Sequence, residues 1–395
     1  MTEPHDTIRA VGLMSGTSLD GVDGACCTID RTATDDPFGY DVTLESFVTV
    51  AYPPALRDRL VAVCDDETGT VDDVCRLNVG LCEVLADVAE RAWTEAGHER
   101  SAVDVIGSHG QTIWHIPAEE PVPGYERASR STLQIGDGSV LSARTGVPTV
   151  SDFRMRDVAA GGHGAPLAPF MDATRFAGES AFRAVQNVGG IGNCTLLPPN
   201  PTMDNVTAFD TGPGNMVIDA VVELLTDGAE TYDVDGELAA RGSVDEGLLE
   251  TLLADDYFAE APPKSTGREY FGHEYARTVI EAGRERGLDD EDIVATATML
   301  TAASIDAAYR DFADRYPDEI YVCGGGASNP TLLEFLRTRT DAPVARLQEL
   351  GMDADAKEAA MFALFAATNC WGEPNNVPSA TGADGPVSMG KVSRP

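Results

Sequence analysis

Two segments, one near the start of each half of the chain, share the same order of features: a strand, a glycine-rich turn and a second strand. The first segment spans residues 8–29 around the turn 15–21, and the second spans 182–197 around the turn 189–193. Each is followed by alternating strand and helix patterns, which is typical of an α/β fold. We therefore predict two α/β lobes related by weak internal duplication, whose glycine turns meet at a cleft.

The periodicity elsewhere supports this organisation. We assign residues 1–152 to an N-terminal lobe, 153–371 to a C-terminal lobe and 372–395 to a turn-rich, irregular tail that can return to the first lobe. A third strand is expected at 42–51 and a buried strand at 319–323. Helices are predicted near 54–64, 71–96, 216–226, 244–254, 272–286, 292–314, 330–338 and 357–370.

The composition is strongly acidic. With 65 acidic and 28 basic residues the formal net charge is -37, and the only lysines are Lys264, Lys357 and Lys391. A dedicated acidic surface would explain this, but the acids are scattered, which favours adaptation to a salt-rich cytoplasm. Such a charge argues against a nucleic-acid partner. No apolar run is long enough for a membrane span and the start of the chain lacks a signal pattern, so we expect a soluble cytoplasmic protein.

The eight cysteines form no CxxC pair and most lie in apolar stretches. This pattern favours reduced, buried thiols over a metal site or a disulfide framework.

The stretch 208–215 places one carboxylate, Asp210, on a turn of glycine and proline before a long apolar helix pattern. Its chemical interpretation is a general base beside bare backbone N–H groups that bind an anion. The alternative is a helix N-cap. Four residues separate Asp210 from the predicted helix, and this weakens the capping interpretation.

Three glycine-rich turns are candidates for binding phosphate or a nucleotide. The turn 15–21 does not fit the GxxxxGK[ST] pattern, yet a hairpin tip can hold phosphate through its amides. The turn 189–193 has the equivalent place in the second half. The run 324–326 follows a buried strand, where α/β sheets bind ligands, although it lacks GxGxxG. Each of them could also be an ordinary turn.

Further polar residues lie at predicted strand ends or helix starts. Arg154 and Arg156 adjoin a glycine-rich segment and could hold an anionic group together. His109, in the loop 107–112, is interpreted as a sugar-hydroxyl contact or a packing residue. Glu358 either complements a helix dipole or binds hydroxyls.

Taken together, these motifs resemble those of the anhydro-N-acetylmuramic acid kinases. They occur in the order of that family from residue 12 to beyond residue 360, so the resemblance covers nearly the whole chain. No single stretch is specific, but the set is. The matching stretches are 12–23, 107–112, 133–137, 152–167, 209–215 and 357–359.

The resemblance implies the two-lobed α/β fold of actin, Hsp70 and the sugar kinases, with ATP in the interlobe cleft. It implies that water opens the 1,6-anhydro ring of 1,6-anhydro-N-acetylmuramic acid while the freed 6-hydroxyl receives the γ-phosphoryl group of ATP. Asp210 would activate the water, and Mg²⁺ and the glycine turns would neutralise and position the phosphates. The family also suggests a homodimer.

The site residues carried over by resemblance fall into three groups. Phosphate and nucleotide contacts are expected at Ser15, Gly16, Thr17, Ser18, Asp20, Gly21, Asp23, Gly189, Gly190, Gly324, Gly325 and Gly326. Sugar contacts are expected at His109, Gln111, Arg156 and Glu358. Mg²⁺ is expected near Asp20 and Asp23, through water.

Two alternatives stay open on the sequence. One is a nucleotide-dependent binding module that keeps the fold without phosphoryl transfer. The other is a kinase for a different anhydro-sugar or amino sugar.

Overall fold

The computed structural model describes residues 6–16, 19–33, 35–124 and 128–395 and forms two compact units. The first unit comprises Met1–Arg175, Thr202–Asp204 and Asp355–Pro395, and the second comprises Phe176–Pro201 and Asn205–Ala354. The division differs from the predicted lobes, because the first unit extends to Arg175 and takes in residues from 355 onward.

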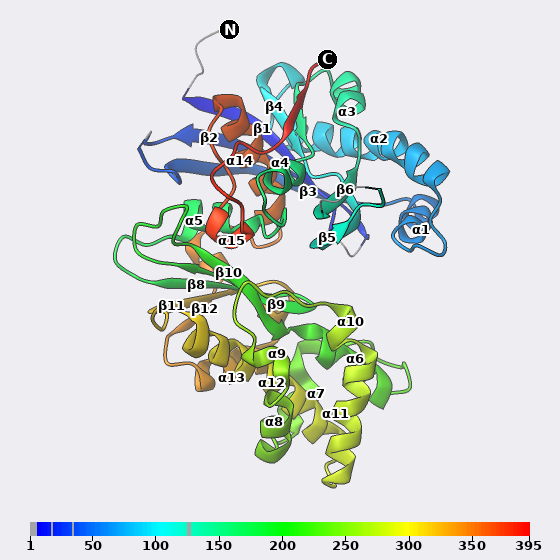
Figure 1. Ribbon diagram of the computed structural model, residues 1–395, viewed down its shortest axis with the longest axis vertical. Coiled ribbons are helices and arrows are strands. Elements are labelled where there is room, and N and C mark those ends of the chain that lie inside the picture. The colour runs from blue at the N-terminus through cyan, green and yellow to red at the C-terminus, as the bar shows by residue number, and fades with distance from the viewer. Residues whose placement is uncertain (1–5, 17–18, 34, 125–127) are drawn as a thin grey trace. The chain divides into compact units, whose positions relative to one another are not determined.

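The first unit is built on a six-stranded sheet in the order β13-β7-β4-β1-β2-β3 (Figure 1). The first three strands form an antiparallel meander, β4 and β7 add parallel to β1, and β13 closes the edge antiparallel to β7. The strands are β1 (Thr7–Met14), β2 (Gly21–Arg31), β3 (Tyr40–Ala51), β4 (Val105–Ser108), β7 (Thr149–Ser151) and β13 (Lys391–Ser393).

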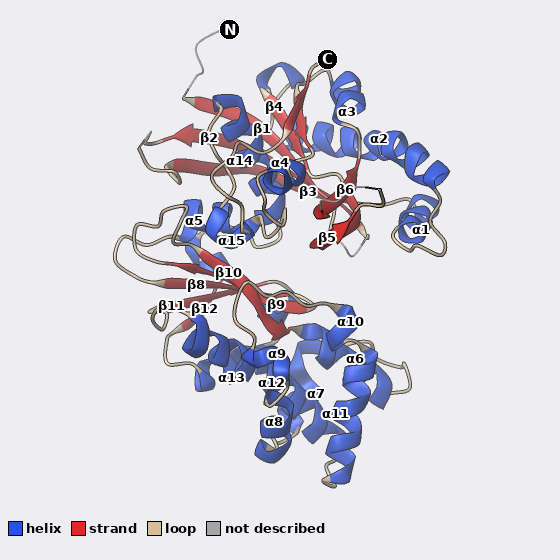
Figure 2. Cartoon of the chain, viewed as in Figure 1, coloured by secondary structure: helices blue, strands red, loops and turns tan. Residues whose placement is uncertain are grey.

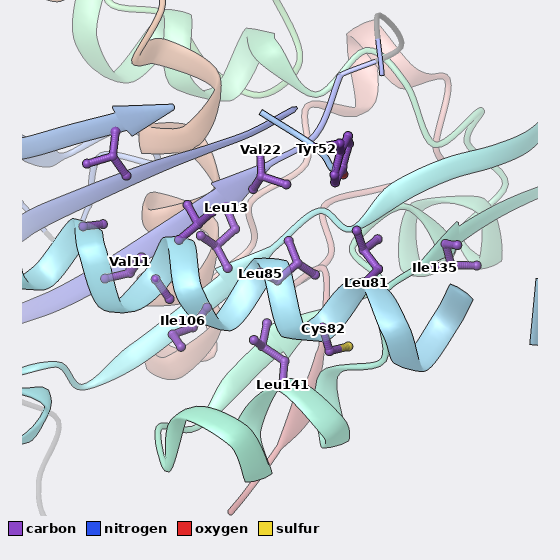
Figure 3. Close-up of a cluster of buried hydrophobic side chains, with 14 of the residues drawn as sticks. Val11, Leu13, Val22, Tyr52, Leu81, Cys82, Leu85, Ile106, Ile135 and Leu141 are labelled. Carbon is purple, nitrogen blue, oxygen red and sulfur yellow. The ribbon is translucent and has the colours of Figure 1, made fainter. Parts of the chain in front are cut away.

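Helices cover both faces of this sheet. Helix α14 (Lys357–Trp371) lies so close to β1 and β4 that a Cβ on Gly12 or Gly107 would be 1.8 or 1.9 Å from a carbonyl oxygen of the helix. Helix α2 (Val71–Glu95) packs on the other face. There it buries a continuous apolar cluster with the strands, shown in Figure 3. Alternation along β1 explains the two faces, since Val11 and Leu13 point into this cluster while Gly12 meets α14.

The second unit has a five-stranded sheet in the order β10-β9-β8-β11-β12. Its first three strands are again an antiparallel meander, and β11 and β12 again add in parallel. This repeats the order β3-β2-β1-β4-β7 of the first unit, so the duplication and the α/β class predicted from the sequence are confirmed. The strands are β8 (Arg183–Val188), β9 (Ile191–Leu197), β10 (Thr207–Pro213), β11 (Glu319–Cys323) and β12 (Val344–Arg346).

Helix α12 (Asp290–Phe312) is the centre of the second unit and packs against β10 and six other helices. Figure 2 shows the helices of this unit gathered on one side of its sheet. Its other helices are α6 (Asn215–Leu225), α7 (Glu237–Arg241), α8 (Glu246–Leu253), α9 (Asp256–Ala259), α10 (Arg268–Phe271), α11 (His273–Glu285) and α13 (Pro330–Arg339), with the short 3₁₀ turns η2 (Val234–Gly236), η3 (Gly325–Ser328) and η4 (Leu347–Leu350).

The remaining elements of the first unit surround its sheet. They are the hairpin β5 (Gln111–Pro121) and β6 (Ala128–Ile135), the helices α1 (Pro54–Val63), α3 (Gly138–Thr145), α4 (Arg154–Ala159), α5 (Ala168–Phe176) and α15 (Pro378–Thr381), and the turn η1 (Arg100–Ala102). None of the described helices combines the length and apolar character needed to cross a membrane.

Two expectations need correction. Most of the tail from residue 372 is irregular and the tail returns to the first unit, as predicted, but it also contains α15 and supplies β13 to the sheet. The thiols are free, but Cys75 and Cys370 are exposed, whereas Cys26, Cys27, Cys82, Cys194 and Cys323 are buried as predicted.

Candidate functional site

Asp210 lies near the carboxyl end of β10, just before a β-bulge that ends at Gly212. It pairs with Asn193 on β9, which in turn pairs with Asn187 on β8. Residues directly opposite one another in a sheet point to the same face. The sheet therefore presents a row of three polar side chains, with the carboxylate at one end.

Three contacts hold Asp210. Its Oδ2 accepts a hydrogen bond of 2.9 Å from Thr266 N, and its backbone N–H donates to Lys264 O at 3.2 Å. Tyr257 Oη donates to its carbonyl oxygen at 3.0 Å. Burial raises the pKa of Asp210 to about 6, against the opposing effects of the Thr266 N–H and the Lys264 charge. A carboxylate with a pKa this close to neutrality is suited to accept a proton in catalysis.

Asp210 is not the N-cap of α6, because Gly214 has that position and no side chain caps the helix. The expectation of bare N–H groups beside the acid is nevertheless wrong. Gly214 N and Met216 N donate to Gly190 O, and Asn215 N donates to Gly189 O, at 2.8–3.0 Å. A Cβ on Gly214 would lie 2.3 Å from Gly189 O, so glycine is what allows this approach. The turn at 189–190 is thereby fixed to the helix that follows Asp210.

The run 324–326 lies at the carboxyl end of β11, beside the end of β8. Gly324 has a φ of 78°, and a Cβ there would be 2.4 Å from Asn187 Oδ1. A Cβ on Gly326 would be 2.5 Å from Val188 Cγ1, whereas Gly324 and Gly325 are exposed. The second unit thus brings Asp210 and the predicted glycine positions 189–190 and 324–326 to one edge of its sheet.

In the first unit, Ser15 and Gln111 are buried and contact each other. Ser15 Oγ lies 2.5 Å from Gln111 Oε1 and 3.0 Å from Gly21 O, and it accepts a hydrogen bond of 2.7 Å from Tyr52 Oη. These contacts fix the base of the turn between β1 and β2. Thr17 and Ser18 lie outside the described residues.

Two acidic residues flank this turn. Asp20 is exposed, and Asp23 accepts a hydrogen bond of 2.6 Å from Thr49 Oγ1. Burial raises the pKa of Asp23, and the charges of Asp20 and Asp355 add to that rise, although the Thr49 contact opposes it. A carboxylate crowded by two others is an environment that a bound cation would relieve.

His109 is joined to Arg154 at the start of α4. Its Nδ1 donates to Gly110 O at 3.0 Å, and its Nε2 accepts from Arg154 Nε at 3.1 Å, since arginine can only donate. Burial and the Arg154 charge lower the pKa of His109 to about 3. Both ring nitrogens are therefore engaged within the protein, and the ring is neutral.

The two arginines of α4 do not act as a pair. Arg154 Nη1 donates to Gly164 O at 2.8 Å, and burial lowers the pKa of Arg154 to about 10 despite the nearby Glu358 and Asp157. Arg156 is exposed and has no ion pair within the described ranges. Residues two apart on a helix point in different directions, so the joint anion clamp is wrong.

Glu358 lies in the first turn of α14, and the residue as a whole is exposed to solvent. Local desolvation nevertheless raises the pKa of its carboxyl group, and the charges of Lys357 and Arg154 oppose the rise. The charge of Arg154 acts on Glu358, and Arg154 also contacts His109, so we treat these three residues of the first unit together.

A separate surface pocket of about 610 Å³ opens in the first unit between α2, β6 and the start of α3. Of the predicted site residues, its lining includes only His109. The pocket therefore shares only His109 with the group around Glu358.

The sequence matches a family model described as anhydro-N-acetylmuramic acid kinase over residues 8–395. The chain belongs to the anhydro-N-acetylmuramic acid kinase family. A family member from Caldanaerobacter subterraneus subsp. tengcongensis is 44% identical over 386 residues, 97% of this chain and 96% of its own. One from Salinibacter ruber is 44% identical over 390 residues, 98% of this chain and 96% of its own.

Among solved structures, an activator of 2-hydroxyisocaproyl-CoA dehydratase from Clostridium difficile with bound ADPNP aligns over 92% of this chain and 96% of its own, with 12% identity and a TM-score of 0.44. A ROK family glucokinase from Streptomyces griseus aligns over 91% and 99%, with 13% identity and a TM-score of 0.39.

The sequence did not point to Thr266 and Lys264 as partners of Asp210 in this family member. They lie more than fifty residues from Asp210, in the loop between α9 and α10. Both residues contact Asp210 through backbone atoms, which every residue type has, so their identity does not reveal the contact. Asp157 is another residue whose contacts the sequence did not indicate. It is fully buried and accepts from Gly164 N, Asn376 Nδ2 and Thr381 Oγ1, each at 2.8 Å.

Proposed function

We propose that this protein is an ATP-dependent kinase that hydrolytically opens the 1,6-anhydro ring of 1,6-anhydro-N-acetylmuramic acid and yields N-acetylmuramic acid 6-phosphate. Family membership over residues 8–395 supports the reaction class. The observation that carries the proposal is the Asp210 carboxylate, held by Thr266 N with a pKa of about 6.

In this mechanism Asp210 takes a proton from the water that attacks the anomeric carbon of the sugar. The bond from that carbon to O6 breaks, O6 forms a bond to the γ-phosphorus of ATP, and ADP leaves. Phosphoryl transfer depends mainly on positioning and charge neutralisation. Asp210 then releases the proton to solvent, so the sugar and one water give the 6-phosphate while ATP gives ADP and one proton is released.

The two glycine-bearing edges are proposed to bind ATP. In the second unit, the exposed Gly324 and Gly325 offer a flat backbone surface for the adenosine, and the turn 189–190 lies beside Asp210. In the first unit, Gly16 and Gly21 belong to the turn whose base Ser15 fixes. The described residues contain no cluster of three or more groups able to hold a metal ion. Mg²⁺ in kinases keeps waters and phosphate oxygens as ligands, so the crowded Asp20 and Asp23 fit a water-mediated role. Bound there, the ion would neutralise phosphate charge.

The sugar is proposed to contact Glu358 and Arg156. Glu358 has a raised pKa and can accept hydrogen bonds from hydroxyls, and Arg156 is exposed and available to a carboxylate such as a lactyl group. Gln111 and His109 are proposed to act indirectly. Gln111 fixes the turn between β1 and β2, and His109 positions Arg154. We further propose action in the cytoplasm of a salt-rich cell, in the recycling of peptidoglycan sugars, and assembly as a homodimer.

Asp210→Asn is the decisive variant. It should lower kcat by at least about 100-fold, the smaller end of what general base catalysis contributes, while ATP affinity by calorimetry stays unchanged. In the wild type, kcat should fall as the pH drops through about 6, because protonated Asp210 cannot accept a proton.

Asp219 on α6 provides a matched control, since burial and Asp233 also raise its pKa to about 6. Asp219→Asn should change neither kcat nor the acid limb of its pH profile, which is the fall of kcat as the pH drops through about 6. Loss of less than about tenfold in kcat for Asp210→Asn would refute its role as base.

The two alternatives predict different outcomes with ATP and sugar. A binding module would bind ATP without sugar-dependent turnover. A kinase for another sugar would prefer that sugar in a small panel of anhydro-sugars. Mass spectrometry in ¹⁸O-labelled water should place the label at the anomeric hydroxyl of the 6-phosphate product, and an unlabelled product would contradict hydrolytic opening.

A further inference from the structure

Lys264 is one of only three lysines in the chain, and its side chain is 9% exposed. Its ammonium lies 3.2 Å from Tyr257 O and 3.5 Å from Phe258 O, and 4.7 and 4.6 Å from the ring centroids of Tyr257 and Phe312. Carbonyl oxygens and aromatic faces both stabilise a cation. These groups form a cage for the Lys264 ammonium.

The caged lysine has no carboxylate within ion-pair distance among the residues that the structure describes. The other buried lysine, Lys357, does pair with an acid, since its Nζ lies 2.9 Å from Asp172 Oδ1. Desolvation of an unpaired ammonium is unfavourable. The position of Lys264 therefore calls for an explanation beyond packing.

Lys264 and one residue of its cage, Tyr257, also hold Asp210. Lys264 O accepts from Asp210 N, and Thr266, two residues further on, donates its N–H to the carboxylate. Tyr257 contributes its carbonyl and ring to the cage and its hydroxyl to Asp210 O. Anchoring the ammonium thus fixes the loop between α9 and α10 at both of its contacts with Asp210.

The charge of Lys264 also acts on Asp210 and opposes the effect of burial. Other titratable groups surround the pair. Cys194 and Tyr257 face both Asp210 and Lys264, and Glu260 and Asp311 act on Lys264. Burial lowers the pKa of Lys264, whereas Glu260, Cys194, Asp311 and Asp210 raise it. Lys264 is the cation whose charge acts on the Asp210 carboxylate.

We propose that Lys264 is a positioning residue for Asp210: its caged ammonium fixes the loop that holds the carboxylate and places a positive charge near it. The inference rests on the proposed role of Asp210 as base. A compact ammonium fits between two carbonyls and two rings, whereas a planar guanidinium is larger and needs a different set of acceptors. This explains a lysine here in a chain whose basic residues are mostly arginines.

Lys264→Met keeps most of the side-chain volume and removes the charge. The acid limb of kcat should move upward by about one pH unit, the smaller end of the effect of a neighbouring opposite charge. From a starting pKa of about 6, this shift would lower the ionised fraction of Asp210 at pH 6 from about one half to about one tenth. The KM for ATP should not change.

Lys264→Arg keeps the charge but does not fit the cage. It should lower kcat at every pH without moving the acid limb, which separates positioning from charge. Arg277→Met is the matched control, because Arg277 is an exposed cation of the same unit that pairs with Glu274. It should change neither kcat nor the limb. Circular dichroism and thermal melting establish that each variant is folded.

A readout without turnover distinguishes this inference from the proposed function. NMR titration of ¹³C-labelled aspartate carboxyl groups, assigned by comparison with Asp210→Asn, gives the pKa of Asp210 directly. If Lys264→Met is folded and moves neither this titration nor the acid limb, the inference is overturned. If Lys264→Met does not fold, Lys264→Arg provides the test. Because this variant keeps the charge, a shift of its acid limb of kcat would overturn the inference. If Asp210→Asn keeps its turnover while Lys264→Met still shifts the titration, the proposed function fails and the pairing stands.

Discussion

At the scale of single residues, His109 is a neutral acceptor rather than an acid or base. Phenylalanine has a similar shape and would keep the contact with the Phe362 ring, 5.0 Å away between centroids. His109→Phe should lower the free energy of unfolding by about 1–3 kcal/mol, because Arg154 Nε loses its acceptor. Urea denaturation measures this loss.

The pH dependence of that loss has a defined sign. The pKa of His109 is lowered from 6.5 to about 3 in the folded protein, so the unfolded chain takes up the proton first as pH falls. The stabilisation is complete above about 6.5 and is lost progressively toward pH 3, and His109→Phe should remove this component. His115 serves as the control, because its Nδ1 is buried with no partner among the described atoms. If His115→Phe is as destabilising as His109→Phe, the Arg154 contact is not the cause.

The residues of the candidate site differ in how far sequence could identify them. Asp210 was found because glycine and proline around an acid are visible in the sequence. Lys264 is notable in the sequence because lysine is rare in this chain, but nothing in the sequence connected it to Asp210. His109 was identified as polar and near a strand end, but its dependence on Arg154 arises only when β4 and α4 come together.

At the scale of elements, the buried Asp157 on α4 joins the C-terminal segment to the first unit. Its Oδ1 accepts from Asn376 Nδ2 and Thr381 Oγ1, and its Oδ2 accepts from Gly164 N. Asp157→Asn replaces an acceptor with a donor and should lower the free energy of unfolding by about 3 kcal/mol. Limited proteolysis should then cut within 372–395, which the wild type protects.

Asp384 offers a matched comparison for this variant. It is an exposed acid of the same segment, and the substitution leaves intact the backbone N–H that donates to Ala160 O. Asp384→Asn should therefore leave stability and proteolysis unchanged. Equal protection of the segment in Asp157→Asn and wild type would contradict the anchoring role.

Most helices and strands could be predicted because their burial follows the local period of the chain. Strand β5 was missed because its outer half is exposed and contains Pro117, so no alternation marks it. The C-terminal segment was expected to be irregular for a related reason. Asn375 and Asn376 order it by accepting from Met389 N and Val387 N at 2.7 Å, and such side-chain-to-backbone contacts have no periodic signature.

At the scale of the whole molecule, the internal duplication was visible in the sequence because each copy opens with the same hairpin. The boundary between the units was not. Helix α14 follows the second sheet in the chain but belongs to the first unit, where Gly12 and Gly107 let it lie against β1 and β4. Two glycines on different strands acquire this meaning only when the strands pair in parallel, which no local pattern specifies.

The net charge of -37 leads to the last prediction, which concerns the whole chain. Scattered carboxylates repel one another, and salt shortens the range of this repulsion from about 30 Å at 0.01 M to about 3 Å at 1 M. The melting temperature and kcat should therefore both rise with KCl toward about 1 M. Because screening depends on ionic strength and not on the cation, choline chloride at equal concentration should raise the melting temperature equally. A maximum in dilute buffer would contradict the salt-adaptation interpretation, and a rise with KCl alone would point to specific potassium binding instead.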